Sequence, residues 1–233
     1  MIETLNSIGI SNTMITSSVL TLIVCIFAII AGRNLEMIPS SKLQILVEIG
    51  LEKLRDFFVE VMGPYSGKKY FPLVGTLFIY IVLANYTGLL PMSGHFPGLQ
   101  APTSSINFPA GLAIVVFFAV QIIGMRETHG IKFYKHLFQP VAFLFPIMLL
   151  EQFVRPVSLT LRLYGNIFGE ESVAHSFFEM VPLGVPVIMQ ALSVLMGAIQ
   201  ALVFALLTGI YVAEAAEHGE EEYYERLHAG EHL

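Results

Sequence analysis

A polar face runs along a stretch of the chain that is otherwise strongly apolar. Its side chains are spaced four, three, four and four residues apart: Glu151, Arg155, Ser158, Arg162 and Asn166. Spacings of three and four bring side chains to one face of an α-helix, so the pattern predicts a helix with a charged stripe. An ionisable group inside a membrane is a candidate functional group, and the chemistry that such a stripe suggests is the attraction and passage of ions.

Arg162 is the central residue of this stripe. Apolar segments flank the stripe on both sides, at residues 141–150 and 181–207. A charge at membrane depth costs about 2.5 to 17 kcal/mol, depending on the reference. An arginine does not escape this cost by deprotonation, because its pKa stays above about 12. Arg162 must therefore face a water-filled cavity or an opposite charge, unless it extends to an interface or lies in a soluble loop.

The last apolar stretch carries a second set of polar side chains, namely Gln190, Ser193 and Gln200. Ser193 and Gln200 are seven residues apart and share a helix face. Polar stripes on two neighbouring helices could line a water path. The alternative for Gln200 is a simple interhelical hydrogen bond, and Ser193 and Thr208 could bond their own helix backbone.

Further titratable groups follow the stripe. Glu170 and Glu171 could carry ions or could simply lie at the membrane interface, and His175 could be pH-sensitive or an ordinary surface histidine. The histidines of the predicted loops show no metal-ligand spacing, and the chain has no phosphate loop, catalytic triad or dinucleotide motif. We expect no catalytic residue, no metal site and no cofactor.

Composition sets the class of protein. Hydrophobic residues make up 55% of the 233 residues and charged residues only 13%, whereas soluble domains carry about 25% charged residues. The chain is therefore expected to be an all-α integral membrane protein with a single membrane domain over residues 1–233. The net charge of -6 reflects an acidic stretch after Ala213, which is expected to be a solvated tail and indicates no nucleic-acid partner. The single Cys25 has no partner for an internal disulfide.

Apolar runs predict five membrane-embedded helices, over about 14–31, 71–90, 106–125, 138–168 and 182–212. A loop over 169–181 is expected between the last two, which are long enough to be tilted. Pro140, Pro146 and Pro156 predict bends. Residues 40–62 predict an amphipathic helix, either along the membrane surface or packed on a partner protein.

Basic residues predict the orientation. Of the 12 lysines and arginines, all but Arg155 and Arg162 lie outside the predicted spans, which leaves ten. With five spans, all ten fall on one side, and basic loops favour the cytoplasm. We therefore expect the N-terminus outside and the C-terminus in the cytoplasm.

The stretch 154–171, VRPVSLTLRLYGNIFGEE, resembles the signature of subunit a of the F-type rotary ATP synthase, the stator part of its membrane sector. Further segments are similar to the same family: LANYTGLLP at 83–91, PTSSIN at 102–107 and IQALVFALLTGIYV at 199–212. The resemblance covers the chain from about residue 40 to its end. The arginine segment is the most specific part.

The resemblance implies roles for individual residues. Arg162 corresponds to the essential arginine that faces the rotor ring, and Gln200 to the glutamine near it. Asn166 and Glu171 correspond to polar positions of the outer half-channel. Two positions depart from the family pattern: members often have an acid at the position of Ser105, and some have a histidine at the position of Ser193.

The resemblance also implies a mechanism and partners. The chain would be a non-catalytic subunit of a bacterial plasma membrane complex, with two half-channels that pass H⁺ or Na⁺ to and from a carboxylate on a rotor ring. Its partners would be a ring of small c-type proteolipids, b-type subunits of the peripheral stalk, and membrane lipid. Two alternatives stay open, a self-contained transporter of an anionic substrate and a structural membrane anchor. The sequence shows no internal repeat, which speaks against a carrier built from inverted repeats.

Overall fold

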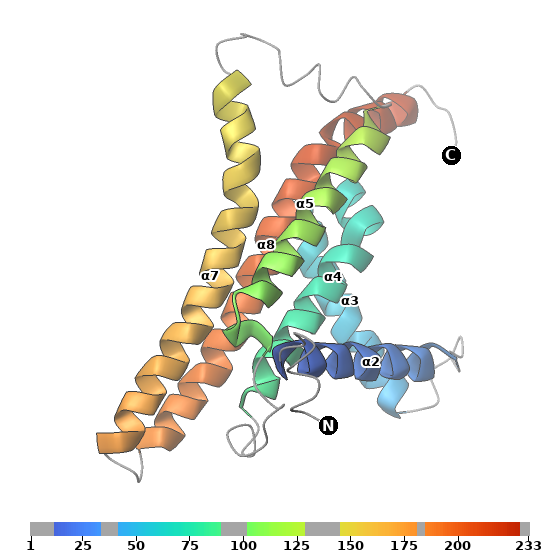
Figure 1. Ribbon diagram of the computed structural model, residues 1–233. Coiled ribbons are helices and arrows are strands. Elements are labelled where there is room, and N and C mark those ends of the chain that lie inside the picture. Colours follow the sequence, from blue (N-terminus) through green and yellow to red (C-terminus); the bar gives the residue numbers. More distant parts are fainter. Residues whose placement is uncertain (1–11, 34–41, 90–101, 129–144, 181–184, 229–233) are drawn as a thin grey trace.

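The computed structural model describes residues 12–33, 42–89, 102–128, 145–180 and 185–228 (Figure 1). Every regular element in these residues is helical, which confirms the all-α fold class. The elements are α2 (Asn12–Arg33), α3 (Lys42–Met62), α4 (Pro64–Thr87), the short 3₁₀ helix η1 (Pro102–Ser104), α5 (Asn107–Glu127), α7 (Phe145–Met180) and α8 (Val185–His228).

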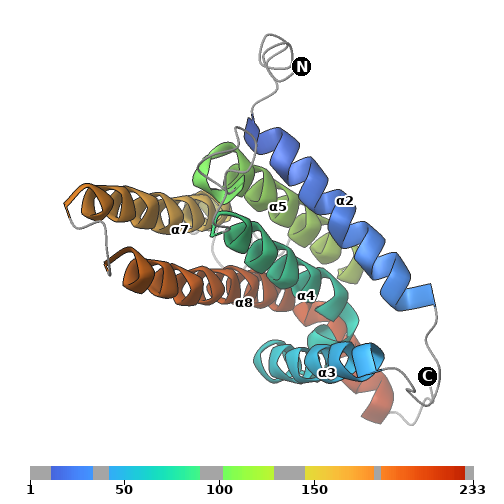
Figure 2. The same ribbon diagram turned by 90° about the horizontal axis from the view of Figure 1, so that it is seen from below.

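Helices α4, α5, α7 and α8 form a bundle in which α8 packs against each of the other three (Figures 1 and 2). As drawn in Figure 1, α4 and α7 run downward, whereas α5 and α8 run upward. We call the end at which α4 finishes the lower end, and the end at which α5 finishes the upper end. The buried core lies between these helices and includes Val74, Ile81, Val116, Leu159, Leu163, Phe204 and Ala205.

The pair α7–α8 is much longer than a membrane crossing requires. With 36 and 44 residues and a rise of about 1.5 Å per residue, the two helices extend about 54 and 66 Å, against a hydrocarbon thickness of about 30 Å. Pro156 lies inside α7, whereas Pro146 is accommodated at its second position. Pro140 lies outside the described residues.

One prediction about the ends of these helices is wrong. The loop expected over 169–181 is helical as far as Met180, because no proline interrupts the segment before Pro182. The acidic stretch after Ala213 is helical and continues α8 to His228, and Glu214, Glu217, Glu221 and Glu225 are exposed there, as expected of a solvated stretch. Its alanines and glutamates are good helix formers, so polarity did not indicate a helix end here.

Three of the described helices are long and apolar enough to cross a membrane. They are Pro64–Thr87, Asn107–Glu127 and Ile188–Glu217, and Met14–Ile30 is a shorter apolar helix. Helix α2 contacts α4 and η1, and Figure 1 shows it lying across the lower part of the bundle at a steep angle to α4 and α5. The protein is thus an integral membrane protein, and the count of five embedded helices stays a prediction.

Helix α3 confirms the helix predicted over residues 40–62, and the structure shows what its last turns contact. Phe58 and Met62 are buried in the core against α4 and α8. Gly63 then reverses the chain with a φ of 85°, a left-handed conformation that suits glycine. Pro64 follows at the first position of α4, where a missing backbone N–H costs nothing. Helix α4 therefore begins earlier than the predicted span at residue 71.

Candidate functional site

The two arginines of the polar stripe both lie on α7, but they differ in their partners. Arg155 binds two carboxylates: its Nη2 lies 2.7 Å from Oε1 of Glu151 on the same helix, and its Nη1 lies 2.6 Å from Oε2 of Glu214 on α8. Its guanidinium also lies over the ring of Tyr211, 4.5 Å from the centroid. Arg155 is thus a neutralised cation that ties α7 to α8.

Arg162 lies two helical turns further along α7, and its side chain is exposed. Within the described residues, no carboxylate or hydrogen-bond acceptor pairs with it. Exposed apolar side chains flank it on α7, with Leu161 at 56% and Val157 at 55%, while Ser158 and Asn166 share its helix face. A permanent charge is therefore presented beside exposed apolar side chains, where it needs a counter-charge or water.

Asn166 and Gln200 join α7 to α8 one turn from Arg162. Asn166 Nδ2 donates a hydrogen bond of 2.6 Å to Gln200 Oε1. Gln200 is only 3% exposed, whereas Asn166 is exposed on the same side of α7 as the arginine. The interhelical hydrogen bond that the sequence suggested as an alternative for Gln200 is therefore present. It connects the interior of the bundle to the face of α7 that carries Arg162.

The remaining predicted residues are arranged around this centre. Ser158 and Ser193 are half-buried, and Glu170 is half-buried one turn beyond Asn166. Glu171 and His175 belong to α7, but their side chains lie outside the described part of the structure.

Two polar residues of α4, which the sequence analysis did not single out, bind α8 near its lower end. Asn85 Nδ2 donates to the carbonyl of Gly197 over 2.8 Å, and the Tyr86 hydroxyl donates to the carbonyl of Val194 over 3.3 Å. Both residues belong to the segment LANYTGLLP. Helical periodicity could not connect these residues to the arginine stripe, because they lie on another helix.

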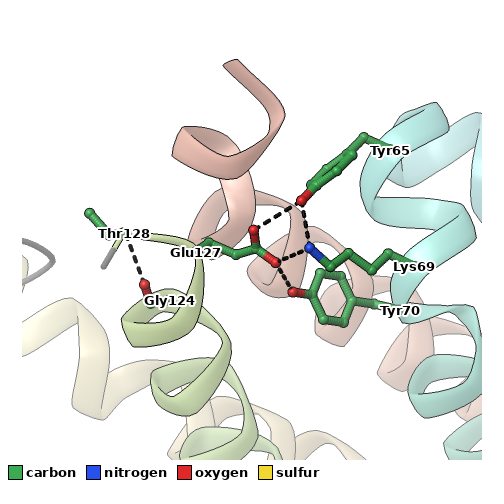
Figure 3. Close-up of polar contacts among 6 residues, drawn as sticks. All are labelled: Tyr65, Lys69, Tyr70, Gly124, Glu127 and Thr128. Carbon is green, nitrogen blue, oxygen red and sulfur yellow. Dashed lines mark hydrogen bonds and ion pairs between the residues drawn. The ribbon is translucent and has the colours of Figure 1, made fainter. Parts of the chain in front are cut away.

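A second charged group, which we call the upper-end cluster, consists of Tyr65, Lys69 and Tyr70 on α4 and Glu127 on α5 (Figure 3). Lys69 Nζ lies 2.7 Å from Glu127 Oε1, and Tyr65 donates to Glu127 Oε2 over 3.0 Å. Tyr70 also donates to Glu127, whose side chain is only 8% exposed. In the sequence, Lys69 served only as one of the basic residues that predict the membrane orientation, and no pattern predicted this cluster.

Among the described residues, no group of three or more histidine, cysteine, aspartate or glutamate side chains is placed to hold a metal ion. The described residues of the site offer Arg162 without an acidic partner, the amide pair of buried Gln200 and exposed Asn166, and a second arginine held by two carboxylates. These groups attract, orient and separate charges.

The fold and the site together define a helical membrane protein built around a charged group on a long helix pair. Comparison with known proteins identifies the family. Residues 14–213 match the ATP synthase A chain family. The chain is 39% identical to ATP synthase subunit a of Moorella thermoacetica over 90% of this chain and 92% of that protein. It is 38% identical to ATP synthase subunit a of Geobacter sp. strain M21, over 93% and 94% respectively.

The chain therefore belongs to the ATP synthase subunit a family. Membership establishes a stator role in the membrane sector F0 of an ATP synthase, within a complex with other F0 subunits. It also establishes that the protein takes part in ion transport linked to ATP synthesis from within a membrane.

Proposed function

We propose that this subunit passes H⁺ or Na⁺ through two half-channels to and from a carboxylate on a rotor ring, and that Arg162 separates the two half-channels. The observation that carries the proposal is the exposed guanidinium of Arg162 beside exposed apolar side chains, without a carboxylate partner in the described residues. Because the charge is permanent, it needs water or a counter-charge, and a carboxylate on a partner protein would supply the counter-charge that the described residues lack. A ring of c-type proteolipids with membrane-embedded carboxylates fits that requirement.

The strength of such a pair suits a moving contact. Two unit charges about 4 Å apart attract by about 4 kcal/mol at an effective dielectric constant of about 20. That attraction favours the ionised carboxylate and offsets part of its desolvation, yet it is weak enough to be broken. The transmembrane potential contributes about 2.3 kcal/mol per charge for each 100 mV, which is of the same order.

The same cation also acts as a barrier. Arg162 lies on α7 between the amide pair Asn166–Gln200 on one side and the Glu151–Arg155–Glu214 group on the other. A fixed positive charge between two polar regions opposes the direct passage of a cation from one to the other. An ion can then cross only by binding to the ring, rotating with it and leaving by the second region.

The proposed orientation follows from the basic residues. The lower end, with Asn166, Glu170 and Glu171, faces outward, and the upper end, with the end of α8, faces the cytoplasm. The N-terminus lies outside. The b-type subunits of the peripheral stalk and membrane lipid contact the remaining surface.

A reversible cross-link tests whether the ring moves against this face. Gly165 is exposed beside Arg162, and a Cβ at this position would contact nothing within 4 Å. In a Cys25→Ser background, we expect Gly165→Cys to form a disulfide with cysteines placed along the membrane segment of the proteolipid. The disulfide should stop ATP-driven ion transport by the whole complex, and a reductant should restore it.

The matched control is Gly111→Cys on α5, another exposed glycine with open space around its Cβ. It should form no cross-link with the same set of proteolipid cysteines. A cross-linked Gly165→Cys complex that still transports ions at the normal rate would contradict the proposal.

A further inference from the structure

Two buried amide atoms near the centre of the site lack a hydrogen-bond partner among the described residues. They are Oδ1 of Asn85 and Nε2 of Gln200. The side chains belong to residues that are only 5% and 3% exposed. Because buried polar atoms are almost always hydrogen-bonded, two such atoms in one region indicate a bound molecule that satisfies them.

Asn85 lies on α4 and Gln200 on α8, and these two helices pack against each other. Asn85 reaches α8 through its bond to the Gly197 carbonyl, and the absence of a side chain at Gly197 allows this approach, since a Cβ there would lie 3.3 Å from Asn85 Cβ. Gln200 follows Gly197 by three residues, which places it one turn further on the same face of α8. Asn85 therefore contacts α8 one turn before Gln200.

The chemistry of the two atoms is complementary. Oδ1 of Asn85 accepts a hydrogen bond, and Nε2 of Gln200 donates one. The other atom of each amide is already engaged, Asn85 Nδ2 with Gly197 and Gln200 Oε1 with Asn166. A water molecule can accept from one free atom and donate to the other, whereas an apolar ligand satisfies neither.

We propose that Asn85 and Gln200 hold an internal water molecule, and that this water continues the polar path from α4 through Gln200 and Asn166 to the face of Arg162. Asn85 is then a positioning residue of the ion path. The sequence did not predict this role, because Asn85 lies outside the polar stripe that contains Arg162. The amides do not titrate: they hold and orient the water through which the ion or proton passes. This inference rests on the proposed function and adds a site to it.

Three variants of the whole complex in membrane vesicles test the site. Asn85→Leu keeps the approximate size but removes both polar atoms, and it should slow ATP-driven ion transport by about tenfold or more while the complex still assembles. Asn85→Ser keeps a polar group and leaves room for water, so it should retain most of the transport. Thr208→Val is the matched control: Thr208 is fully buried on α8, but its hydroxyl bonds only its own helix, at the Phe204 carbonyl. This variant should transport normally.

A chemical probe makes the test independent of assembly defects. In a Cys25→Ser background, silver ions should reach Asn85→Cys through the water path and inhibit transport, whereas Thr208→Cys should remain insensitive. Normal transport by Asn85→Leu, or equal silver sensitivity of the two cysteine variants, would overturn the water site. If transport by Asn85→Leu is normal while substitution of Arg162 abolishes it, the water site fails and the proposed function stands. If silver inhibits Asn85→Cys while substitution of Arg162 leaves transport normal, the water site stands and the proposed function fails.

Discussion

Arg155 and Arg162 are the same residue type on the same face of the same helix, yet the structure uses them differently. Arg155 is held by Glu151 and Glu214 and covered by the Tyr211 ring, with a side chain that is 20% exposed. Arg162 is exposed beside apolar side chains and pairs with no acid in the described residues. The difference arises on α8, which presents a carboxylate opposite one arginine and an amide near the other.

This contrast separates a charge that stabilises the fold from a charge that is available to a partner. A paired arginine contributes to the packing of α7 on α8, and its net effect on stability is modest because desolvation offsets much of the attraction. An unpaired arginine makes no such contact, and its permanent charge remains available to a partner. The upper-end cluster of Tyr65, Lys69, Tyr70 and Glu127 belongs with Arg155, since its carboxylate is fully partnered.

The largest effect is expected from replacing each of the two arginines by lysine. Arg162→Lys should abolish ion-coupled ATP synthesis although the complex assembles, because lysine is a compact, strongly hydrated ammonium whose charge is lost more readily on burial. Arg155→Lys should keep most of the activity, since an ammonium can still bind Glu151 or Glu214. The measurement is ATP synthesis driven by an imposed ion gradient in proteoliposomes. Equal activities of the two lysine variants would remove the distinction between the arginines.

A smaller effect is expected at the proposed outer path. Glu171 lies between the lower end of α7 and Arg162, so Glu171→Gln should slow ATP-driven ion pumping several-fold without loss of assembly. Pumping in membrane vesicles measures the rate, and Glu170→Gln identifies the alternative carrier. Unchanged pumping by both variants, alone and combined, would count against an acidic outer path.

Removal of a partnered charge should change stability rather than transport. Glu127→Gln keeps the size of the side chain but weakens three hydrogen bonds, so it should lower the stability of the α4–α5 contact by about 1–3 kcal/mol. Thermal unfolding of the purified subunit in detergent measures this change. The neighbouring Arg126→Gln is the control, because Arg126 is exposed and its loss should have little effect. A Glu127→Gln subunit as stable as the wild type would show that the cluster contributes nothing to the fold.

The smallest effect is expected from Glu214→Gln. The side chains of Glu214 and Arg155 are 51% and 20% exposed, and Arg155 retains Glu151 after the change. The loss should be about 0.2–1 kcal/mol, typical of an exposed pair. The same unfolding assay should therefore show a barely shifted midpoint. A large loss of transport in this variant would mean that the second arginine, too, takes part in ion passage.

The sequence predicted the helical class and the charged helix face because both depend on local patterns, namely apolar length and a spacing of three and four residues. The contact between Asn166 and Gln200 could have been predicted, since each residue belongs to a recognisable polar stripe and an interhelical hydrogen bond was considered for Gln200. Glu214 as the partner of Arg155, Asn85 as a partner of α8 and the upper-end cluster were not predicted. Each depends on the rotation and register of helices that are distant in the sequence.

The wrong prediction at the end of α7 has a cause in local polarity. Residues 169–181 contain glutamates, serine and histidine, and their polarity suggested a loop. Polarity ends a membrane span but does not end a helix, and α7 continues because the segment lacks a proline. The acidic end of α8 likewise continues as a helix beyond the apolar span.

The central claim, that Arg162 separates two ion paths whereas Arg155 does not, is tested most directly by passive ion flux. Proteoliposomes would hold the whole ATP synthase complex with Arg162→Ala, Arg155→Ala or neither change, and the decay of an imposed proton or sodium gradient would be followed without ATP or ADP, so that the ring does not turn. We predict that Arg162→Ala makes the complex leak and that Arg155→Ala keeps it as tight as the wild type. An ion-tight Arg162→Ala complex with near-normal ATP synthesis would contradict the account and would favour a structural anchor.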